Sequence, residues 1–290
     1  SFTRVSDTIV RNGIAMYTSF MYSTPTAQDF NVNGSVNSLF FDNTSATLYA
    51  TGSFTTVNGG LSTRKYAAAF DTSTAKATSF NPDLDNIGYC ITSNGTYIYI
   101  GGFFNRVNDS SFPVQRLYAA AFNKATGAVI TTWQPDLNSY VYSIAPETST
   151  STNIAIGGSF RAAKTLFRNN LASVNILSDV IYAWNPNVNG PVYALALTKT
   201  AVYAGGSFTK VNGNAYLRNY LAAFDMSFGN ANAWDPNVNG DVYTLLPIGN
   251  YMYIGGAFTS IAFAATARNY GAAVDVGDSS VIYSWDPNTN

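Results

Sequence analysis

The chain has 290 residues, of which 47% are apolar and 15% aromatic, so it can bury a substantial core and is neither disordered nor a disulfide-stapled miniprotein. Charged residues make up only 11%, the formal net charge is −1 and no run of lysines or arginines occurs, so the sequence lacks the clustered cations of a nucleic-acid surface and no nucleic-acid partner is expected. The longest apolar stretch, residues 261–267, is far shorter than the roughly 18 residues of a membrane-spanning helix, so no membrane insertion is expected.

The polar residues of the chain are mostly of the uncharged kind. Asn, Ser, Thr, Tyr and Gly are abundant, Glu147 is the only glutamate and Cys90 is the only cysteine. This composition is typical of secreted microbial surface proteins, so we expect an extracellular or cell-surface location.

A segment of about 50 residues recurs six times, with copies beginning near residues 1, 53, 103, 159, 207 and 257. Such a period is typical of propeller blades or of stacked solenoid coils. Each copy opens on a phenylalanine, continues to an arginine with an alanine four residues later, and closes on an aromatic residue before a turn. The phenylalanines are Phe2, Phe54, Phe104, Phe160, Phe208 and Phe258; the arginines are Arg11, Arg64, Arg116, Arg168, Arg218 and Arg268; the alanines are Ala15, Ala68, Ala120, Ala172, Ala222 and Ala272; the closing aromatics are Phe30, Phe80, Trp133, Trp184, Trp234 and Trp285.

Each copy is expected to contain four strands. In the clearest one, residues 192–195 and 202–204 alternate with period two around a short polar turn, which predicts a β-hairpin. Residues 220–225 and the segment ending at Trp234 predict two more strands, each bounded by turn residues such as Asn212-Gly213. The first strand carries a small residue at one position, as an innermost strand crowded near an axis requires: Ser38, Cys90, Ser143, Ala194 and Thr244.

These elements predict an all-β fold, a six-bladed β-propeller of four-stranded antiparallel blades that forms a single domain over residues 1–290. The competing architecture is an open solenoid of stacked sheets. Closure is favoured because six copies fall within the usual range of about four to eight blades and no copy has the polar character of a solenoid cap.

The copies resemble the delta-60 repeat family of bacterial β-propellers, whose consensus runs through Gly-Gly-x-Phe, Arg-Asn, Leu-Ala-x-Phe-Asp and Trp-x-Pro. The fifth copy matches it with Gly205-Gly206-Ser207-Phe208, Arg218-Asn219, residues 221–225 and Trp234-Asp235-Pro236. The resemblance covers the whole chain and is weakest in the first copy, where Phe30-Asn31-Val32 replaces the Trp-x-Pro turn. It implies a propeller, but little about activity, because the members are mostly surface or secreted modules without a characterised function.

The given sequence does not contain a whole number of repeats. Ser1 aligns with Ser207 and Asn290 aligns with Asn239, so the sequence holds six copies of the third and fourth strands but five of the inner hairpin. One blade is therefore expected to lack the equivalent of residues 240–256, which would leave unpaired strand edges. Two explanations remain open: polypeptide beyond this sequence supplies the hairpin, or a neighbouring molecule donates it.

Residues with catalytic or metal-binding chemistry are few. The chain has no histidine, which removes the commonest general base and metal ligand, and it has no zinc or haem spacing. Cys90, on an inner strand, is expected to be a small buried hydrophobe. Asp83 and Asp85 are the carboxylates that a glycosidase would use, whereas Asp235 and Asp286 occupy a position that other copies fill with Asn or Gln and are expected to cap turns. We expect no catalytic, cofactor-binding or metal-binding residues.

The recurring arginine has two interpretations. A ring of guanidinium groups could bind acidic glycans, or each arginine could bond backbone carbonyls or pack against the aromatic residue of the neighbouring blade, and its presence in every copy favours the structural role. The four tryptophans likewise share one structural position. Binding sites are expected where the copies differ, in the insertions at residues 108–115, 146–153 and 261–267. The first insertion carries Phe112 and the last carries Phe263, candidate binding residues that could stack on a sugar or anchor a protein.

These features predict a non-enzymatic module, secreted or on the cell surface, that serves as a rigid scaffold for protein contacts or for extracellular assembly. The alternative is a lectin-like adhesin that binds glycans in the grooves between blades or at the loops around Phe112 and Phe263. A third possibility is a polysaccharide-active enzyme, because propellers host many chemistries. A protein partner or self-association is favoured over a glycan, and no cofactor is expected.

Overall fold

The computed structural model describes residues 3–4, 9–17, 24–108, 110–147, 152–262 and 266–287. The chain forms two compact units, Ser1–Gln134 and Pro135–Asn290. Every regular element of the described residues is a β-strand and the sheets are antiparallel, so the predicted all-β class is confirmed. In this part of the chain no helix has the length and apolarity needed to cross a bilayer.

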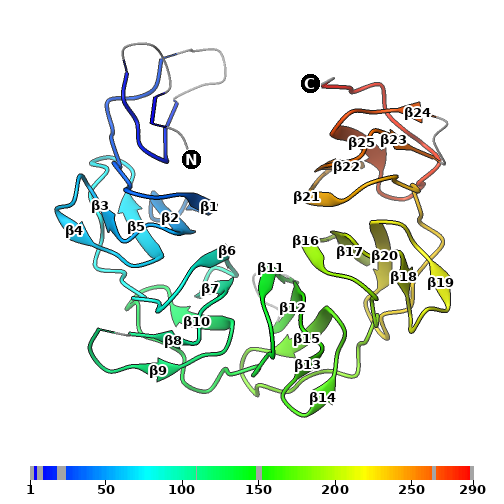
Figure 1. The fold of residues 1–290 in the computed structure, drawn as a ribbon, viewed down its shortest axis with the longest axis horizontal. Helices are drawn as coiled ribbons and strands as arrows, with labels where there is room; N and C mark the ends of the chain where they lie inside the picture. Colours follow the sequence, from blue (N-terminus) through cyan, green and yellow to red (C-terminus); the bar gives the residue numbers. More distant parts are fainter. Residues whose placement is uncertain are drawn as a thin grey trace. The chain divides into compact units, whose positions relative to one another are not determined.

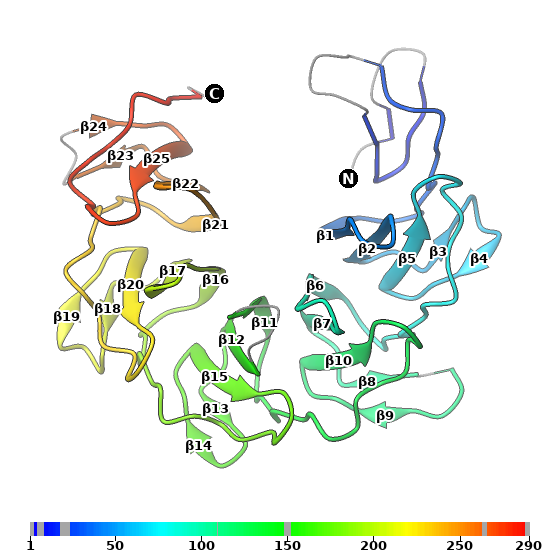
Figure 2. The ribbon, with the colours of Figure 1, turned by 180° about the vertical axis from the view of Figure 1, so that it is seen from behind.

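Both units are built from one repeated group of strands, a three-stranded sheet with a two-stranded hairpin, which we call a blade (Figure 1). The hairpin is inserted between the second and third strands of the sheet, and within a blade it lies at the end opposite the first strand (Figures 1 and 2). The first unit holds blade 1, with sheet β1 (Val36–Asp42), β2 (Thr47–Gly52) and β5 (Ala67–Asp71) and hairpin β3 (Thr56–Val57) and β4 (Ser62–Thr63), and blade 2, with sheet β6 (Gly88–Ser93), β7 (Tyr97–Gly102) and β10 (Ala119–Asn123) and hairpin β8 (Arg106–Val107) and β9 (Val114–Gln115).

The second unit holds three blades of the same construction. Blade 3 has sheet β11 (Val141–Pro146), β12 (Asn153–Gly158) and β15 (Leu171–Asn175) and hairpin β13 (Ala162–Ala163) and β14 (Leu166–Phe167). Blade 4 has sheet β16 (Val192–Leu197), β17 (Ala201–Gly206) and β20 (Leu221–Asp225) and hairpin β18 (Lys210–Val211) and β19 (Tyr216–Leu217). Blade 5 has sheet β21 (Val242–Ile248), β22 (Tyr251–Gly256) and β25 (Gly271–Asp275) and hairpin β23 (Ser260–Ile261) and β24 (Thr266–Ala267).

The predicted inner hairpin and third strand are confirmed in all five blades, but the predicted fourth strand is not. The segment that ends at the closing aromatic pairs with the third strand at a single bridge, as Phe224 does with Ala231 in blade 4. A turn precedes this segment, and in it the Asp225 carboxylate accepts hydrogen bonds from the backbone N–H groups of Ser227 and Phe228. After the turn only a short stretch follows the third strand, where the Asp225 N–H donates to the Asn230 carbonyl (2.9 Å) and the Asn232 N–H donates to the Ala223 carbonyl (3.0 Å). Each blade is therefore a sheet of three strands plus a short hairpin that the sequence did not predict.

A glycine at the end of every second strand permits a bulge in the first strand. The bulge of blade 4 lies between Val192 and Ala194, opposite Gly205 and Gly206. A side chain on Gly206 would overlap the carbonyl oxygen of Pro191, so the backbone can approach only because the residue has no Cβ. The same overlap exists at the corresponding glycine of the other blades: Gly52, Gly102, Gly158 and Gly256.

The residue two positions after each recurring arginine adopts a left-handed backbone conformation. In blade 4 it is Tyr220, with φ of 64°; its N–H donates to the carbonyl of Phe208 (2.8 Å) and its carbonyl accepts from Gly206 (2.9 Å). These two bonds return the chain from the short hairpin to the third strand of the sheet. Tyrosine is an uncommon residue at positive φ, whereas Asn170, which stands there in blade 3, tolerates it more readily.

The apolar core lies between successive blades inside each unit. One buried cluster joins Leu171 and Trp184 of blade 3 to Phe208 and Phe224 of blade 4, and another joins blades 4 and 5 around Trp234. The first strands also meet through the predicted small residues, since Ser143 accepts a hydrogen bond on its hydroxyl from the Leu195 N–H (3.0 Å). Side chains that differ from one blade boundary to the next are therefore the ones that can create sites.

Candidate binding sites between successive blades

Each recurring arginine donates hydrogen bonds to backbone carbonyls of its own repeat. Arg218 donates from Nη1 to the carbonyl of Leu217 (2.8 Å) and from Nη2 to the carbonyl of Asn232 (2.7 Å). The other five also donate to the carbonyl of the preceding residue and to one 14 or 15 positions later: Arg11, Arg64, Arg116, Arg168 and Arg268. This is the arrangement that the structural interpretation predicts, and it directs the guanidinium donors to the backbone rather than to a ligand.

The residue after three of the four closing tryptophans contacts the arginine of the same repeat. Gln134 accepts a hydrogen bond from Arg116 (3.1 Å), and the Asp235 and Asp286 carboxylates lie 3.5 and 3.7 Å from Arg218 and Arg268. Asp235 also accepts from the Asn237 N–H (3.1 Å), which makes it the predicted turn cap. Burial raises the pKa of Asp235, and the Arg218 charge opposes that rise.

Two of the tryptophans form hydrogen bonds between successive blades. The indole Nε1 of Trp184 donates to the carbonyl of Asp225 (2.7 Å) and that of Trp234 donates to the carbonyl of Asp275 (2.8 Å), in each case at the end of the following blade's third strand. Trp133 is buried as well, whereas Trp285 is 45% exposed.

The two carboxylates considered for a glycosidase serve turns of blade 2. Asp85 accepts from the N–H groups of Asn105 (2.8 Å) and Arg106 (3.1 Å), as Asn189 does from Thr209 and Lys210 in blade 4. Asp83 has a positive φ of 45° and accepts from the Ser110 N–H (2.6 Å). Cys90, predicted to be buried, is half-buried on β6, beside the bulge that opens its strand.

Some of the exposed apolar side chains lie on the short hairpins, two of which fall in the predicted insertions at residues 108–115 and 261–267. Phe112 lies in the turn between β8 and β9 and is 85% exposed, while Phe263 lies outside the described residues. Other hairpins expose large apolar side chains as well: Leu61 between β3 and β4, Leu166 and Phe167 on β14, and Tyr216 and Leu217 on β19.

A polar groove of about 500 Å³ runs between blades 3 and 4 and is lined by Ser159, Arg161, Phe167, Asn169, Asn170, Asn187, Asn189, Gly190, Pro191, Gly213 and Asn214. Two of its amides are hydrogen-bonded to each other, with Asn169 Nδ2 donating to Asn187 Oδ1 (2.7 Å). Phe167 is 60% exposed at this groove, where Arg161 and Asn214 are exposed too. The first unit has a similar groove of about 560 Å³ at the corresponding positions, which include Asn31, Asn33, Gly34 and Gly59.

A smaller cavity of about 40 Å³ opens at the other end of the boundary between blades 3 and 4. We call it the Glu147 pocket; its lining is Glu147, Asn153, Ala155, Ser173, Trp184, Leu197, Val202 and Met226. Ala155 stands on the second strand where the other blades have tyrosine: Tyr49, Tyr99, Tyr203 and Tyr253. Two residues of the lining, Glu147 and Asn153, belong to the insertion in which the sequence predicted a binding site.

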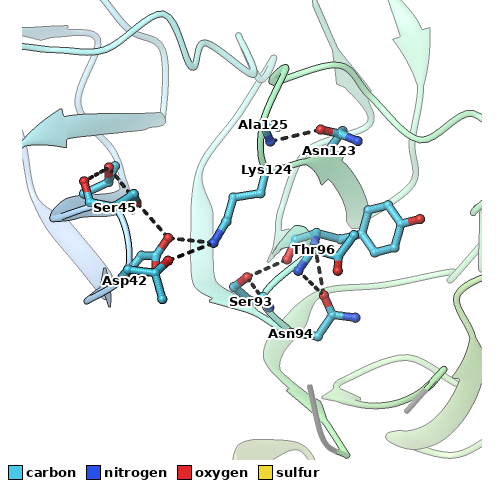
Figure 3. Close-up of polar contacts among 12 residues, drawn as sticks. Asp42, Ser45, Ser93, Asn94, Thr96, Asn123, Lys124 and Ala125 are labelled. Carbon is cyan, nitrogen blue, oxygen red and sulfur yellow. Dashed lines mark hydrogen bonds and ion pairs between the residues drawn. The ribbon is translucent and has the colours of Figure 1, made fainter. Parts of the chain in front are cut away.

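The corresponding place between blades 1 and 2 is filled by an ion pair. The Lys124 ammonium, directly after β10, lies 2.7 Å from the Asp42 carboxylate at the end of β1 (Figure 3). Burial of Asp42 opposes ionisation, but hydrogen bonds from Lys124, Thr44 and Ser45 outweigh it and hold the Asp42 pKa well below its ordinary value.

Comparisons with known proteins give a fold and no family. No protein-family model matches the chain, and no curated protein matches it. Among solved structures, the chain is similar to the computationally designed Ika8 protein, with a TM-score of 0.51 and 12% identity over 86% of this chain and 60% of that one. It is similar to the structure of a Nidogen/Laminin complex, with a TM-score of 0.56 and 10% identity over 88% of this chain and 81% of that one. These likenesses support a propeller-like all-β fold.

Proposed function

We propose that the chain is a non-enzymatic, six-bladed β-propeller of the delta-60 repeat type that acts outside the cell as a structural scaffold, in contact with other proteins and first of all with further copies of itself. The observation that carries the proposal is the set of exposed apolar side chains on the short hairpins. Leu166, Phe167, Tyr216 and Leu217 provide it on two successive blades of the second unit, and Leu61 and Phe112 provide it in the first unit. Contiguous exposed apolar surface is typical of protein-interaction sites, and pairs of neighbouring apolar side chains such as Leu166-Phe167 and Tyr216-Leu217 favour such contacts here.

The low charge of the chain favours contacts between copies. With a net charge of −1, two copies do not repel each other at long range. Because several blades carry an apolar hairpin, contacts that are weak singly would add through multivalency. The solved Nidogen/Laminin structure is itself titled as a complex of two proteins, which makes protein binding a reasonable use of a similar fold.

Two contacts in the first copy of the repeat, made by Arg11 and Phe30, support the proposal of a sixth repeat. Arg11 donates to the carbonyls of Val10 (2.8 Å) and Thr26 (2.6 Å), the same pair of bonds that the arginines of blades 1 to 5 make. Phe30, the closing aromatic of this copy, is fully buried beside Phe70 of blade 1. These two features match those of the arginine and of the closing aromatic in the other copies, which supports counting the first copy as a sixth repeat, although its described residues include no regular strand.

Sedimentation velocity over a range of protein concentrations tests the proposal. We expect the wild-type chain to self-associate and the L166S/F167S/Y216S/L217S variant to remain monomeric. L177S/V180S is the control, because Leu177 and Val180 are also exposed in the second unit but lie in the turn after β15 rather than on a hairpin. A wild-type chain that stays monomeric and is not retained by an immobilised second copy would contradict the proposal.

The polar groove between blades 3 and 4 favours a second function, glycan binding. An exposed Phe167 ring beside Arg161 and Asn214 offers a stacking surface next to hydrogen-bond donors, which is how proteins recognise sugars. A glycan array would test it, with R161A/N214A as the discriminating variant. This variant should lose glycan binding but keep self-association, because it leaves the apolar hairpins intact.

A further inference from the structure

Blade 5 exposes the face that blade 4 buries. In blade 4, Ala196 and Trp234 are each 5% exposed and lie in one apolar cluster with residues of β21 and β22. Leu246 stands in blade 5 where Ala196 stands in blade 4, because each pairs with the tyrosine of the second strand. Leu246 is 54% exposed, and Trp285, the equivalent of Trp234, is exposed as well. This side of blade 5 therefore has the residues of a blade boundary without a blade of the second unit to cover them.

The side chains on this side are larger than those of blade 4. Tyr251, for example, stands where blade 4 has Ala201. We call Leu246, Ile248, Tyr251 and Trp285 the tail face; all four are uncharged and at least 40% exposed. A repeat face that remains in water is expected to be polar, so this apolar one indicates that another surface covers it.

Blade 1 of the first unit has an exposed face of the opposite side. Leu39 and Phe41 on β1 pair with Ala50 and Leu48, on the side of the blade that packs against the first copy of the repeat. In blade 4 the equivalent of Leu39 is Leu195, which packs against blade 3. Leu39 and Phe41 are instead about half exposed, and we call them the head face. The head face thus has the position that meets a preceding blade elsewhere in the chain.

We propose that the tail face of one molecule binds the head face of a second copy of this chain. The model for the contact is the boundary between blades 4 and 5, where β21 lies against β16 and β17. In the proposed contact, β1 of the second copy takes the place of β21 and packs against β21 and β22 of the first. A second copy is the favoured occupant because one chain carries both halves of such a boundary, and neither half brings a charge to be buried.

The inference rests on the proposed self-association and names surfaces that form it. The two faces are different, so the contact is heterologous, and each molecule can use its tail face and its head face at once. Repetition of the contact gives an open chain of molecules or a closed ring. Because the hairpin contacts proposed above are weak singly, we expect the assembly to need both kinds of surface.

Two variants, each with one damaged face, test the proposal by sedimentation velocity. L246S/Y251S damages the tail face and L39S/F41S damages the head face, and each alone should be monomeric at concentrations at which the wild type associates. An equimolar mixture should form a dimer and nothing larger, because the intact tail face of one variant meets the intact head face of the other. L177S/V180S, whose substitutions lie outside both faces, should associate as the wild type does.

The fluorescence of Trp285 gives a second readout in the same mixture. The other three tryptophans are buried, so the change on dimer formation should come from Trp285. We expect its emission to move to shorter wavelength when the variants are mixed, and W285F in the variant with the intact tail face should remove that shift.

The outcomes separate this inference from the proposed function. A mixture that stays monomeric, or face variants that associate as strongly as the wild type, would overturn the inference and leave the hairpin contacts untouched. A wild-type chain that stays monomeric would overturn both. Association that survives L166S/F167S/Y216S/L217S but not L246S/Y251S would support the two faces and contradict the role of the hairpins.

Discussion

Thr51 of blade 1 packs against Gly88 of blade 2, so the larger residue of this contact lies on the earlier blade. At the blade boundaries of the second unit the larger residue lies on the later blade. In the second unit, a glycine near the end of the second strand faces a valine that begins the next blade's first strand: a Cβ on Gly205 would lie 2.6 Å from Cγ1 of Val242. In the first unit the larger residue, Thr51, is on the second strand, and a Cβ on Gly88 would overlap its Oγ1. One side chain fits into each boundary, and either blade can supply it.

The exchange predicts a strong coupling between these two positions. G88V should destabilise the chain by about 1–3 kcal/mol because it overpacks a filled boundary. T51G/G88V recreates the pairing of Gly205 with Val242 and should recover much of that loss, although the Thr51 hydroxyl bond to the Tyr66 carbonyl (2.7 Å) disappears. A double-mutant cycle from urea unfolding measures the coupling. Additive effects of the two substitutions would show that the side chains do not share one space.

Removal of a recurring arginine should destabilise the folded chain, because the arginine bonds backbone carbonyls of its own repeat. The Arg168 side chain is buried and donates to the carbonyls of Phe167 (2.8 Å) and Tyr182 (2.6 Å). R168M leaves both acceptors without this donor, so we expect a loss of about 2 kcal/mol in the free energy of unfolding. R161M, at an exposed position of the same hairpin, should change it by less than about 0.5 kcal/mol. Equal effects of the two variants would argue against the structural role.

The sequence predicted the repeat well because its recurring residues each meet a requirement within one copy. Arg218 donates hydrogen bonds to the carbonyls of Leu217 and Asn232, and Gly206 leaves room for the bulge of the first strand. Both residue types therefore recur in every blade. The two-residue strands of the short hairpins are too brief to show a period. The expected fourth strand pairs with the third strand at only one bridge, after a turn capped by Asp225.

The candidate sites were harder to predict because they join residues from neighbouring blades. Ala155 and Met226 are unremarkable in a sequence of this composition, and only the register of the strands brings them to one pocket with Glu147. The signal that could have located it was the exception at Ala155, where four other copies have tyrosine.

The Asp42–Lys124 pair should make stability depend on pH in the acid range. The folded-state pKa of Asp42 lies below its ordinary value of 3.8, so the ionised carboxylate stabilises the folded chain above that value. This contribution is lost as the pH falls through the folded-state pKa. D42N should therefore cost roughly 1–3 kcal/mol near neutral pH, and the difference from wild type should shrink progressively below about pH 4.

Urea unfolding of wild type and D42N at a series of pH values measures that difference. K124M is the companion variant, since it removes the other partner and should reduce the acid dependence in the same way. A difference between wild type and D42N that stays constant into the acid range would show that the folded chain does not favour the ionised form of Asp42, and would contradict the prediction.

The vacancy at Ala155 predicts a stabilising substitution. In blade 4 the Tyr203 hydroxyl donates to the carbonyl of Val276 in blade 5 (2.7 Å), and its ring packs edge-on against Trp234 at 4.9 Å. Met226 corresponds to Val276, so a tyrosine at position 155 has both a ring to pack against, Trp184, and a carbonyl to bond. A155Y should raise the free energy of unfolding by about 1 kcal/mol, because it fills a cavity with the side chain that the fold uses elsewhere.

A155F separates the contribution of the ring from that of the hydroxyl, since it fills the space without the hydroxyl and should give a smaller gain. A loss of stability in both variants would mean that the backbone of blade 3 has adjusted to alanine, and that the pocket is a fixed feature of this boundary rather than an unfilled tyrosine site.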